Sequence, residues 1–122
     1  MGILWRPMRP KDVRGCADIV AAHPVNGARY GDQIIHLSKV WLSLLGREAF
    51  RAVVFESVNG SRPPEPIGVG VSAFVSDAFL LELKTPPFGW IGPELVRRIV
   101  EGNDPLLSDK QVRQAKDRKS VV

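Results

Sequence analysis

The chain has 122 residues, 44% of them hydrophobic and 25% charged, with a net charge of +4. This size suits one domain with one hydrophobic core, and this composition excludes a wholly disordered chain and a membrane-spanning helix, which needs roughly 20 consecutive apolar residues. Cys16 is the sole cysteine and has no partner for an internal disulfide, so we expect a reducing, cytoplasmic location.

The first elements expected are a strand over residues 3–9 and a helix that follows it. Pro10 favours the first turn of that helix, because its missing N–H has no partner there in any case. Pro24 and Gly27 both oppose continuation, so the helix is expected to end in the segment 23–27. Apolar residues recur at helical spacing and predict its buried face, which comprises Val13, Cys16, Ala17, Val20 and Ala21.

A second helix is expected to follow in residues 32–46. Asp32 has the side chain of an N-cap, and Gly46 has the backbone freedom that commonly ends a helix. The residues expected on its buried face are Ile34, Leu37, Trp41, Leu44 and Leu45.

The chain then changes to a strand-forming pattern. Residues 50–56 and 67–75 are rich in β-forming side chains, and the segment 58–66 between them is rich in Asn, Gly, Ser and Pro. This arrangement predicts an antiparallel hairpin with a long turn. Residues 76–85 fit either a short helix or a buried strand, and the capping pair Ser76-Asp77 favours the helix.

Two further helices are expected near the end of the chain. One begins at Pro93 and ends at Gly102. The other begins with a capping box formed by Ser108 and Gln111. The resulting order is strand, helix, helix, strand, strand and C-terminal helices, which predicts an α+β (α/β-like) fold.

Four segments carry a resemblance to a known family. They are Arg6-Pro7-Met8-Arg9-Pro10-Lys11-Asp12, Val53-Val54-Phe55-Glu56, Asn59-Gly60 and Ile67-Gly68-Val69-Gly70. In the order strand, two helices and antiparallel hairpin, they resemble the N-terminal half of the GCN5-related N-acetyltransferase (GNAT) fold. The resemblance covers residues 3–75.

This resemblance implies a partial GNAT-like fold with a GNAT-like N-terminal half-domain at residues 1–85. A helical C-terminal segment at 86–116 would belong to the same truncated domain. The intact parent protein would transfer an acetyl group from acetyl-CoA to an amine. The family binds the cofactor's pyrophosphate with an Arg/Gln-x-x-Gly-x-Gly/Ala loop, whereas no Arg or Gln here has a Gly three residues later. We therefore expect no cofactor to bind to this chain, and no catalysis by it alone.

The C-terminal segment carries a second resemblance. From Trp90-Ile91-Gly92-Pro93-Glu94-Leu95 onward, it resembles the first part of longer bacterial proteins that end in a LuxR-type helix-turn-helix. This implies an alternative function, a non-enzymatic input domain of a transcriptional regulator that binds a ligand or a partner. The helices that read DNA would then belong to a missing C-terminal domain.

The basic residues do not themselves form a nucleic-acid site. The 17 Lys and Arg residues are spread over several segments, and aromatic side chains that stack on bases are not interleaved with them. Nucleic-acid contact is therefore expected only through the missing C-terminal domain.

The last six residues are Asp117-Arg118-Lys119-Ser120-Val121-Val122. They match the translation of a common sequencing-library adapter, so we expect residues 117–122 to be a non-native tail and the chain to be a fragment. A truncated sheet exposes an edge and a face, which predicts association with a second copy or with the missing C-terminal half.

One polar cluster is the expected substrate-binding site. It comprises His23, Arg29 and Tyr30, because in the GNAT family the loop between the first two helices shapes the pocket for the small-molecule acceptor. The alternative is that these residues form a helix stop and a surface loop. Glu56 and Glu82 would serve as a general base only if burial raised a pKa; we expect Glu56 to be solvated. Catalytic residues are otherwise not identified, and two His and one Cys give no metal-binding pattern.

Overall fold

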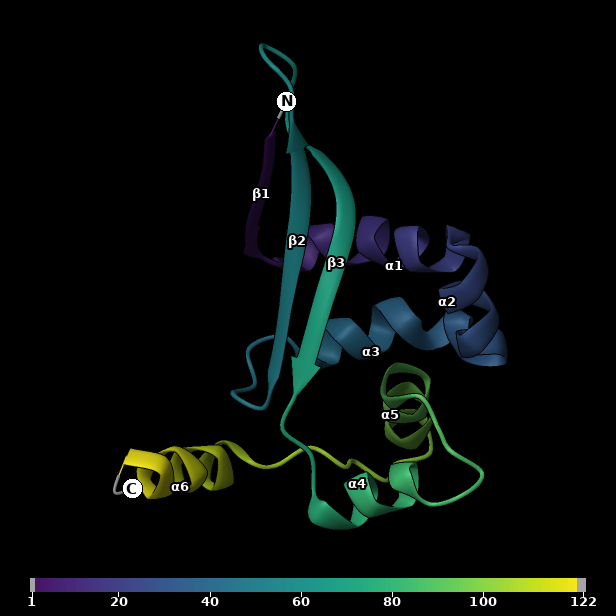
Figure 1. Cartoon of the computed structure of the whole chain (residues 1–122), viewed down its shortest axis with the longest axis vertical. Coiled ribbons are helices and arrows are strands. Elements are labelled where there is room, and N and C mark those ends of the chain that lie inside the picture. Colours follow the sequence, from purple (N-terminus) through teal and green to yellow (C-terminus); the bar gives the residue numbers. More distant parts are fainter. Residues whose placement is uncertain (1, 121–122) are drawn as a thin grey trace.

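The computed structural model describes the backbone of residues 2–120 and the side chains of residues 2–116. The fold is α+β. Its sheet is antiparallel, with strands in the order β1 (Gly2–Pro7), β2 (Phe50–Val58) and β3 (Glu65–Ala73) (Figure 1). The predicted hairpin is thereby confirmed.

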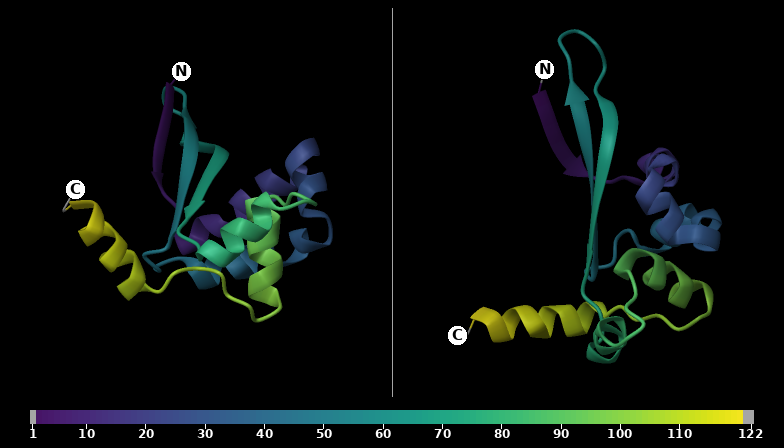
Figure 2. Two further views of the ribbon diagram at one scale, coloured as in Figure 1. Left: turned by 60° about the horizontal axis from the view of Figure 1, so that its bottom comes forward. Right: turned by 45° about the vertical axis from the view of Figure 1, so that its right-hand side comes forward.

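The described part of the chain also contains helices, which loops connect to one another and to the strands. The helices are α1 (Val13–Ala22), α2 (Pro24–Tyr30), α3 (Leu37–Leu44), α4 (Asp77–Lys84), α5 (Ile91–Val100) and α6 (Asp109–Ser120), with 3-10 turns at Pro10–Asp12 and Gly31–His36. The first three and α5 lie on one side of the sheet, whereas α6 lies beyond the end where β2 begins (Figures 1 and 2). In the described part of the chain, no helix combines the length and apolarity that crossing a membrane requires.

The core lies between the sheet and this helical layer. The predicted faces are buried at Val13, Cys16, Ala17 and Val20 of α1 and at Leu37, Trp41 and Leu44 of α3. Ala21 was expected to be buried but is exposed, because it lies on the solvent side of α1 next to Val20. The same core cluster includes Leu95, Val96, Leu106 and Val112 from the C-terminal segment. The division of the chain at residue 85 stays a prediction.

The segment 23–27 ends the first helix as predicted, because α1 stops at Ala22 and His23 is its extended C-cap. A helix that was not expected, α2, begins directly at Pro24, because proline is well tolerated in the first turn of a helix. Asp32 was expected to be an N-cap. It lies instead inside a 3-10 turn that begins at Gly31, a residue with a positive φ of 52°, and α3 does not start until Leu37.

Other predicted helix ends are confirmed. The Ser76 side chain accepts a hydrogen bond from the Phe79 N–H at 3.3 Å and caps α4. The Ser108 N–H donates to Gln111 Oε1 at 2.8 Å, while the Gln111 N–H donates to Ser108 Oγ at 3.1 Å, which is the expected capping box. Gly102, with a φ of 83°, follows the end of α5.

The segment after α5 is fastened to one end of the sheet. The Ser76 N–H donates to the Pro105 carbonyl at 2.8 Å, and the Leu107 N–H donates to the Phe74 carbonyl at 3.0 Å. These two bonds flank a bridge between Val75 and Leu106. The chain that leaves α5 is therefore held by the chain that leaves β3.

Arg6 connects three segments on the covered face of the sheet. Its guanidinium donates two hydrogen bonds to the Asp12 carboxylate, at 2.6 and 2.9 Å, and one to Glu56 at 2.9 Å. The expectation that Glu56 is solvated is therefore wrong, because its side chain is only 15% exposed and pairs with Arg6. The bonds from Arg6 also lower the pKa of Asp12 to about 2.

The opposite face of the sheet is open. Trp5 pairs in register with Phe55, and the Phe55 side chain lies next to Gly68 and Gly70 of β3. Trp5 is 66% exposed, and Ile3 on the same strand face is exposed as well. The self-association expected from an exposed sheet stays a prediction.

We predict that Asp12→Asn lowers the free energy of unfolding at about pH 7 by about 1 kcal/mol, since Arg6 loses a charged acceptor. The folded-state pKa of Asp12, about 2, lies below its unfolded value of about 4. The stability from this contact is therefore present above about pH 4 and is lost as the pH falls toward about 2. Urea unfolding over this range should show the difference from the unsubstituted chain shrinking.

The matched control is Asp18→Asn, which removes an exposed carboxylate of α1 that has no ion pair among the described side chains. It should change the unfolding free energy little at any pH. A deficit in Asp12→Asn that stays constant down to about pH 2 would show that the ion pair is not its cause.

Candidate functional site

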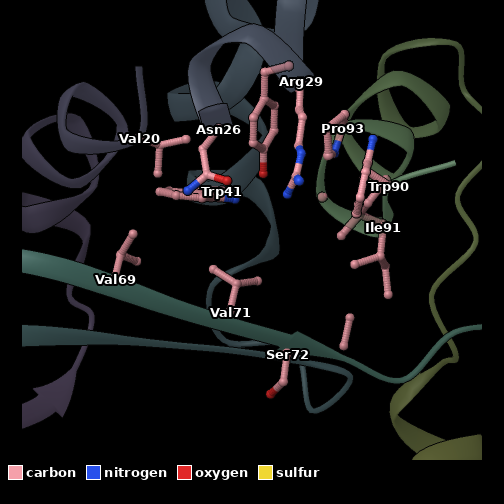
Figure 3. A pocket seen from close by; sticks show the side chains of 14 residues that line it. Val20, Asn26, Arg29, Trp41, Val69, Val71, Ser72, Trp90, Ile91 and Pro93 are labelled. Atoms are coloured by element: carbon pink, nitrogen blue, oxygen red, sulfur yellow. The ribbon is translucent and has the colours of Figure 1, made fainter. Parts of the chain in front are cut away.

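An open cavity of about 290 Å³ lies between the helical layer and β3 (Figure 3). Its walls come from the end of α1, from α2, α3 and β3, and from the first turns of α5. Its lining includes Arg29, Tyr30, Trp41, Val71, Trp90 and Gly92.

The turn between α1 and α2 places the polar side chains of the cavity. His23 is the N-cap of α2, and its Nδ1 accepts a hydrogen bond from the Asn26 N–H at 3.2 Å. One turn later, Gly27 lies so close to α1 that a Cβ on it would be 2.5 Å from the Ala21 carbonyl oxygen. This close approach directs the last turn of α2, with Arg29, toward the cavity.

Arg29 and Trp90 meet at the mouth of the cavity. The guanidinium carbon of Arg29 lies 3.7 Å from the centroid of the Trp90 ring, which is a cation–π contact (Figure 3). Arg29 lies in the last turn of α2 and Trp90 is the N-cap of α5, so this contact joins the two helices.

Tyr30 lies on the same side and faces Gly92. A Cβ on Gly92 would overlap the Tyr30 hydroxyl oxygen, so the phenol fills the space that a side chain at position 92 would need. Burial raises the pKa of Tyr30, which keeps the phenol neutral and able to donate a hydrogen bond at physiological pH.

The remaining walls are largely apolar. Trp41, which is 3% exposed, lies beside Asn26, and Val69 and Val71 face them from β3 (Figure 3). Ser72 points to the opposite side of β3, because successive strand residues alternate between faces.

The structure brings two of the three predicted site residues together. Arg29 and Tyr30 line the cavity, whereas His23 is exposed and caps α2 outside the lining. Sequence analysis missed the roles of Trp41 and Trp90. The sequence predicts Trp41 only as a residue of a buried helix face. Trp90 stands just before a helix, and no sequence motif there indicates a binding role.

The two acidic candidates for a general base lie elsewhere. Glu56 pairs with Arg6, and Glu82 pairs with Arg98 of α5. Neither lines the cavity. Among the described side chains, no three from His, Cys, Asp and Glu gather closely enough to hold a metal ion.

No protein-family model, curated protein or solved structure matches the chain. The likeness to the GNAT and LuxR-type families therefore stays a prediction.

We predict that Gly27→Ala destabilises the fold by about 1–3 kcal/mol, because the new methyl group meets the backbone carbonyl of Ala21. The Ala21 carbonyl belongs to the backbone and cannot rotate away as a flexible side chain can. We therefore expect α2 to shift, which increases the distance between Arg29 and Trp90. Urea unfolding measures the loss, and Trp90 fluorescence should change with it.

Gly15→Ala in α1 is the matched control, because a Cβ at Gly15 would have no atom within 4 Å. It should leave the stability unchanged or raise it by up to about 1 kcal/mol. Equal effects of the two substitutions would contradict the close contact between α1 and α2.

Proposed function

We propose that this chain is a ligand-binding module that holds a small molecule in the cavity between α2, β3 and α5. The observation that carries the proposal is an open cavity lined by Tyr30, Trp41 and Trp90 together with one cation, Arg29. Mostly apolar cavities with a few polar groups are the usual form of small-molecule sites. A volume of about 290 Å³ is small for such a site and suits a ligand of one or two rings.

The titratable side chains of the lining favour binding over catalysis. They are Arg29 and Tyr30. General acid–base catalysis is most efficient when the pKa of the group lies near the working pH. An arginine stays protonated, and burial moves the pKa of Tyr30 further from neutrality. Both side chains are therefore suited to holding and orienting a molecule.

A ligand in this cavity would reinforce a contact between distant parts of the chain. Arg29 belongs to the helices that follow β1, and Trp90 begins α5. A molecule that touches both stabilises the arrangement in which α2 and α5 are close. This is the behaviour required of the input domain of a LuxR-type regulator, where the state of α5 would be passed to a C-terminal DNA-binding domain.

One observation favours a second candidate function, the N-terminal half of an acetyltransferase. The helices α1, α2 and α3 lie between β1 and the antiparallel β2–β3 hairpin, so the order agrees with that expected for the GNAT fold, with one helix more than the resemblance implies. In that case the cavity would be part of the acceptor site, and acetyl-CoA would bind mainly to residues of the missing half.

The three tryptophans allow a direct test of the ligand-binding proposal. Trp41 and Trp90 line the cavity, while Trp5 lies on the open face of the sheet and serves as an internal reference. In NMR spectra of the labelled chain, addition of small aromatic compounds such as indole or 2-naphthoate should shift the indole N–H signals of Trp41 and Trp90. The Trp5 signal should stay in place.

Val71→Phe and Ser72→Phe form a matched pair for this experiment. The first fills the cavity and should abolish the response, whereas the second places the same ring on the other face of β3 and should preserve it. Shifts at Trp5 as large as those at Trp41, or an unchanged response in Val71→Phe, would exclude the cavity as the binding site.

Acetyl-CoA tests whether this chain alone binds the cofactor of the second candidate function. We predict that it produces no saturable shift at Trp41 or Trp90, because the chain has no Arg/Gln-x-x-Gly loop for the pyrophosphate. Desulfo-CoA, which lacks the thiol and the acetyl group, is the control for weak contact with the nucleotide. Saturable binding of acetyl-CoA at these signals would favour the acetyltransferase.

A further inference from the structure

The guanidinium of Arg29 contacts an aromatic ring. Several arginines pair with acids, such as Arg6 with Asp12 and Arg97 with Glu94, whereas others, such as the exposed Arg14, have no acid partner among the described side chains. Within the described part of the chain, no carboxylate lies within ion-pair distance of Arg29, which contacts the ring of Trp90 instead. The cavity therefore presents a positive charge at its mouth that no carboxylate of the described residues pairs with.

The stacking on Trp90 determines which side of the guanidinium remains available. A guanidinium carries its N–H donors in the plane of the group, whereas the ring of Trp90 lies against the carbon at 3.7 Å. The contact with the ring leaves the N–H edge of Arg29 able to form the two parallel hydrogen bonds that a carboxylate accepts. Stacking also reduces the side-chain freedom that would be lost on binding.

The wall below the mouth suits an apolar body. Trp41, Val69 and Val71 offer ring and methyl surfaces, and Tyr30 supplies a neutral hydroxyl. Burying an apolar ring against these side chains is favourable at about 25 cal/mol per Å² of surface removed from water. An ammonium group would be repelled by Arg29 and would find no acid in the described lining to pair with.

We propose that the ligand of this cavity is an organic carboxylate with an apolar body of one or two rings, whose carboxylate is bound by Arg29. This inference rests on the proposed ligand-binding function. It specifies the charge of the ligand, which that function leaves open.

Three compounds with the same body test the charge. They are 2-naphthoate, the neutral 2-naphthamide and the cationic 2-naphthylmethylamine, titrated into the labelled chain with the indole signals of Trp41 and Trp90 as the readout. We expect 2-naphthoate to bind about tenfold or more tightly than 2-naphthamide, and the amine to bind most weakly. Raising the salt concentration should weaken the binding of 2-naphthoate and leave the binding of 2-naphthamide unchanged.

Substitution of Arg29 assigns the preference to this side chain. Arg29→Gln should reduce the affinity for 2-naphthoate to that for 2-naphthamide, and Arg29→Lys should retain part of it, since a lysine keeps the charge without the planar donors. Arg14→Gln is the control, because it removes the same charge from an exposed site on α1. It should leave both affinities unchanged.

The outcomes distinguish this inference from the function on which it depends. If the amide binds at Trp41 and Trp90 as tightly as the carboxylate, or if Arg29→Gln preserves the preference, the inference is overturned and the ligand-binding function stands. If none of the three compounds shifts these signals, both are overturned.

Discussion

The position of the helical layer depends on the charge of Arg6. This side chain leaves β1 on the covered face of the sheet and meets Asp12 at the start of α1 and Glu56 on β2. The two carboxylates are 11% and 15% exposed and the Arg6 side chain is 25% exposed, so removal of one carboxylate leaves the guanidinium with one charged partner fewer. Asp12 thus fixes where α1 begins, and the chain then turns at His23 into α2. The cavity wall formed by α2 therefore depends on an ion pair at the other end of α1.

Covering only one face of the sheet gives the two faces different properties. On the covered face, α2 and α5 approach β3 without filling the space between them, and a cavity remains beside Trp41. On the open face, Trp5 and Phe55 remain in solvent. Since α5 leads into the segment that is bonded to the end of β3, a molecule between α2 and α5 lies close to the path that the chain takes toward its C-terminus.

Features that depend on residues close together in the chain, such as helix faces and helix caps, could be predicted from the sequence. The apolar spacing of Val13, Cys16 and Val20, and the pair Ser108–Gln111, act within a few residues, and the structure confirms them. Pro24 ends the first helix as predicted, but the sequence did not show that it also begins α2, whose place depends on the contact with α1. The pairs Arg6–Glu56 and Arg29–Trp90 join residues far apart in the chain, and neither leaves a pattern in the sequence.

The lining of the cavity bears differently on the two proposed functions. An acetyltransferase acceptor site receives an amine, which is cationic in water, and must remove its proton before transfer. Here the described lining offers a cation, Arg29, and a phenol, Tyr30, whose raised pKa makes it a poor base. The charge of Arg29 disfavours binding of a cationic amine, and Tyr30 is poorly suited to remove its proton. The same features favour an anion, because Arg29 attracts it and Tyr30 donates a hydrogen bond to it. A bound carboxylate whose apolar body also touches Trp90 would bridge α2 and α5, which is how a binding module reports that its site is occupied.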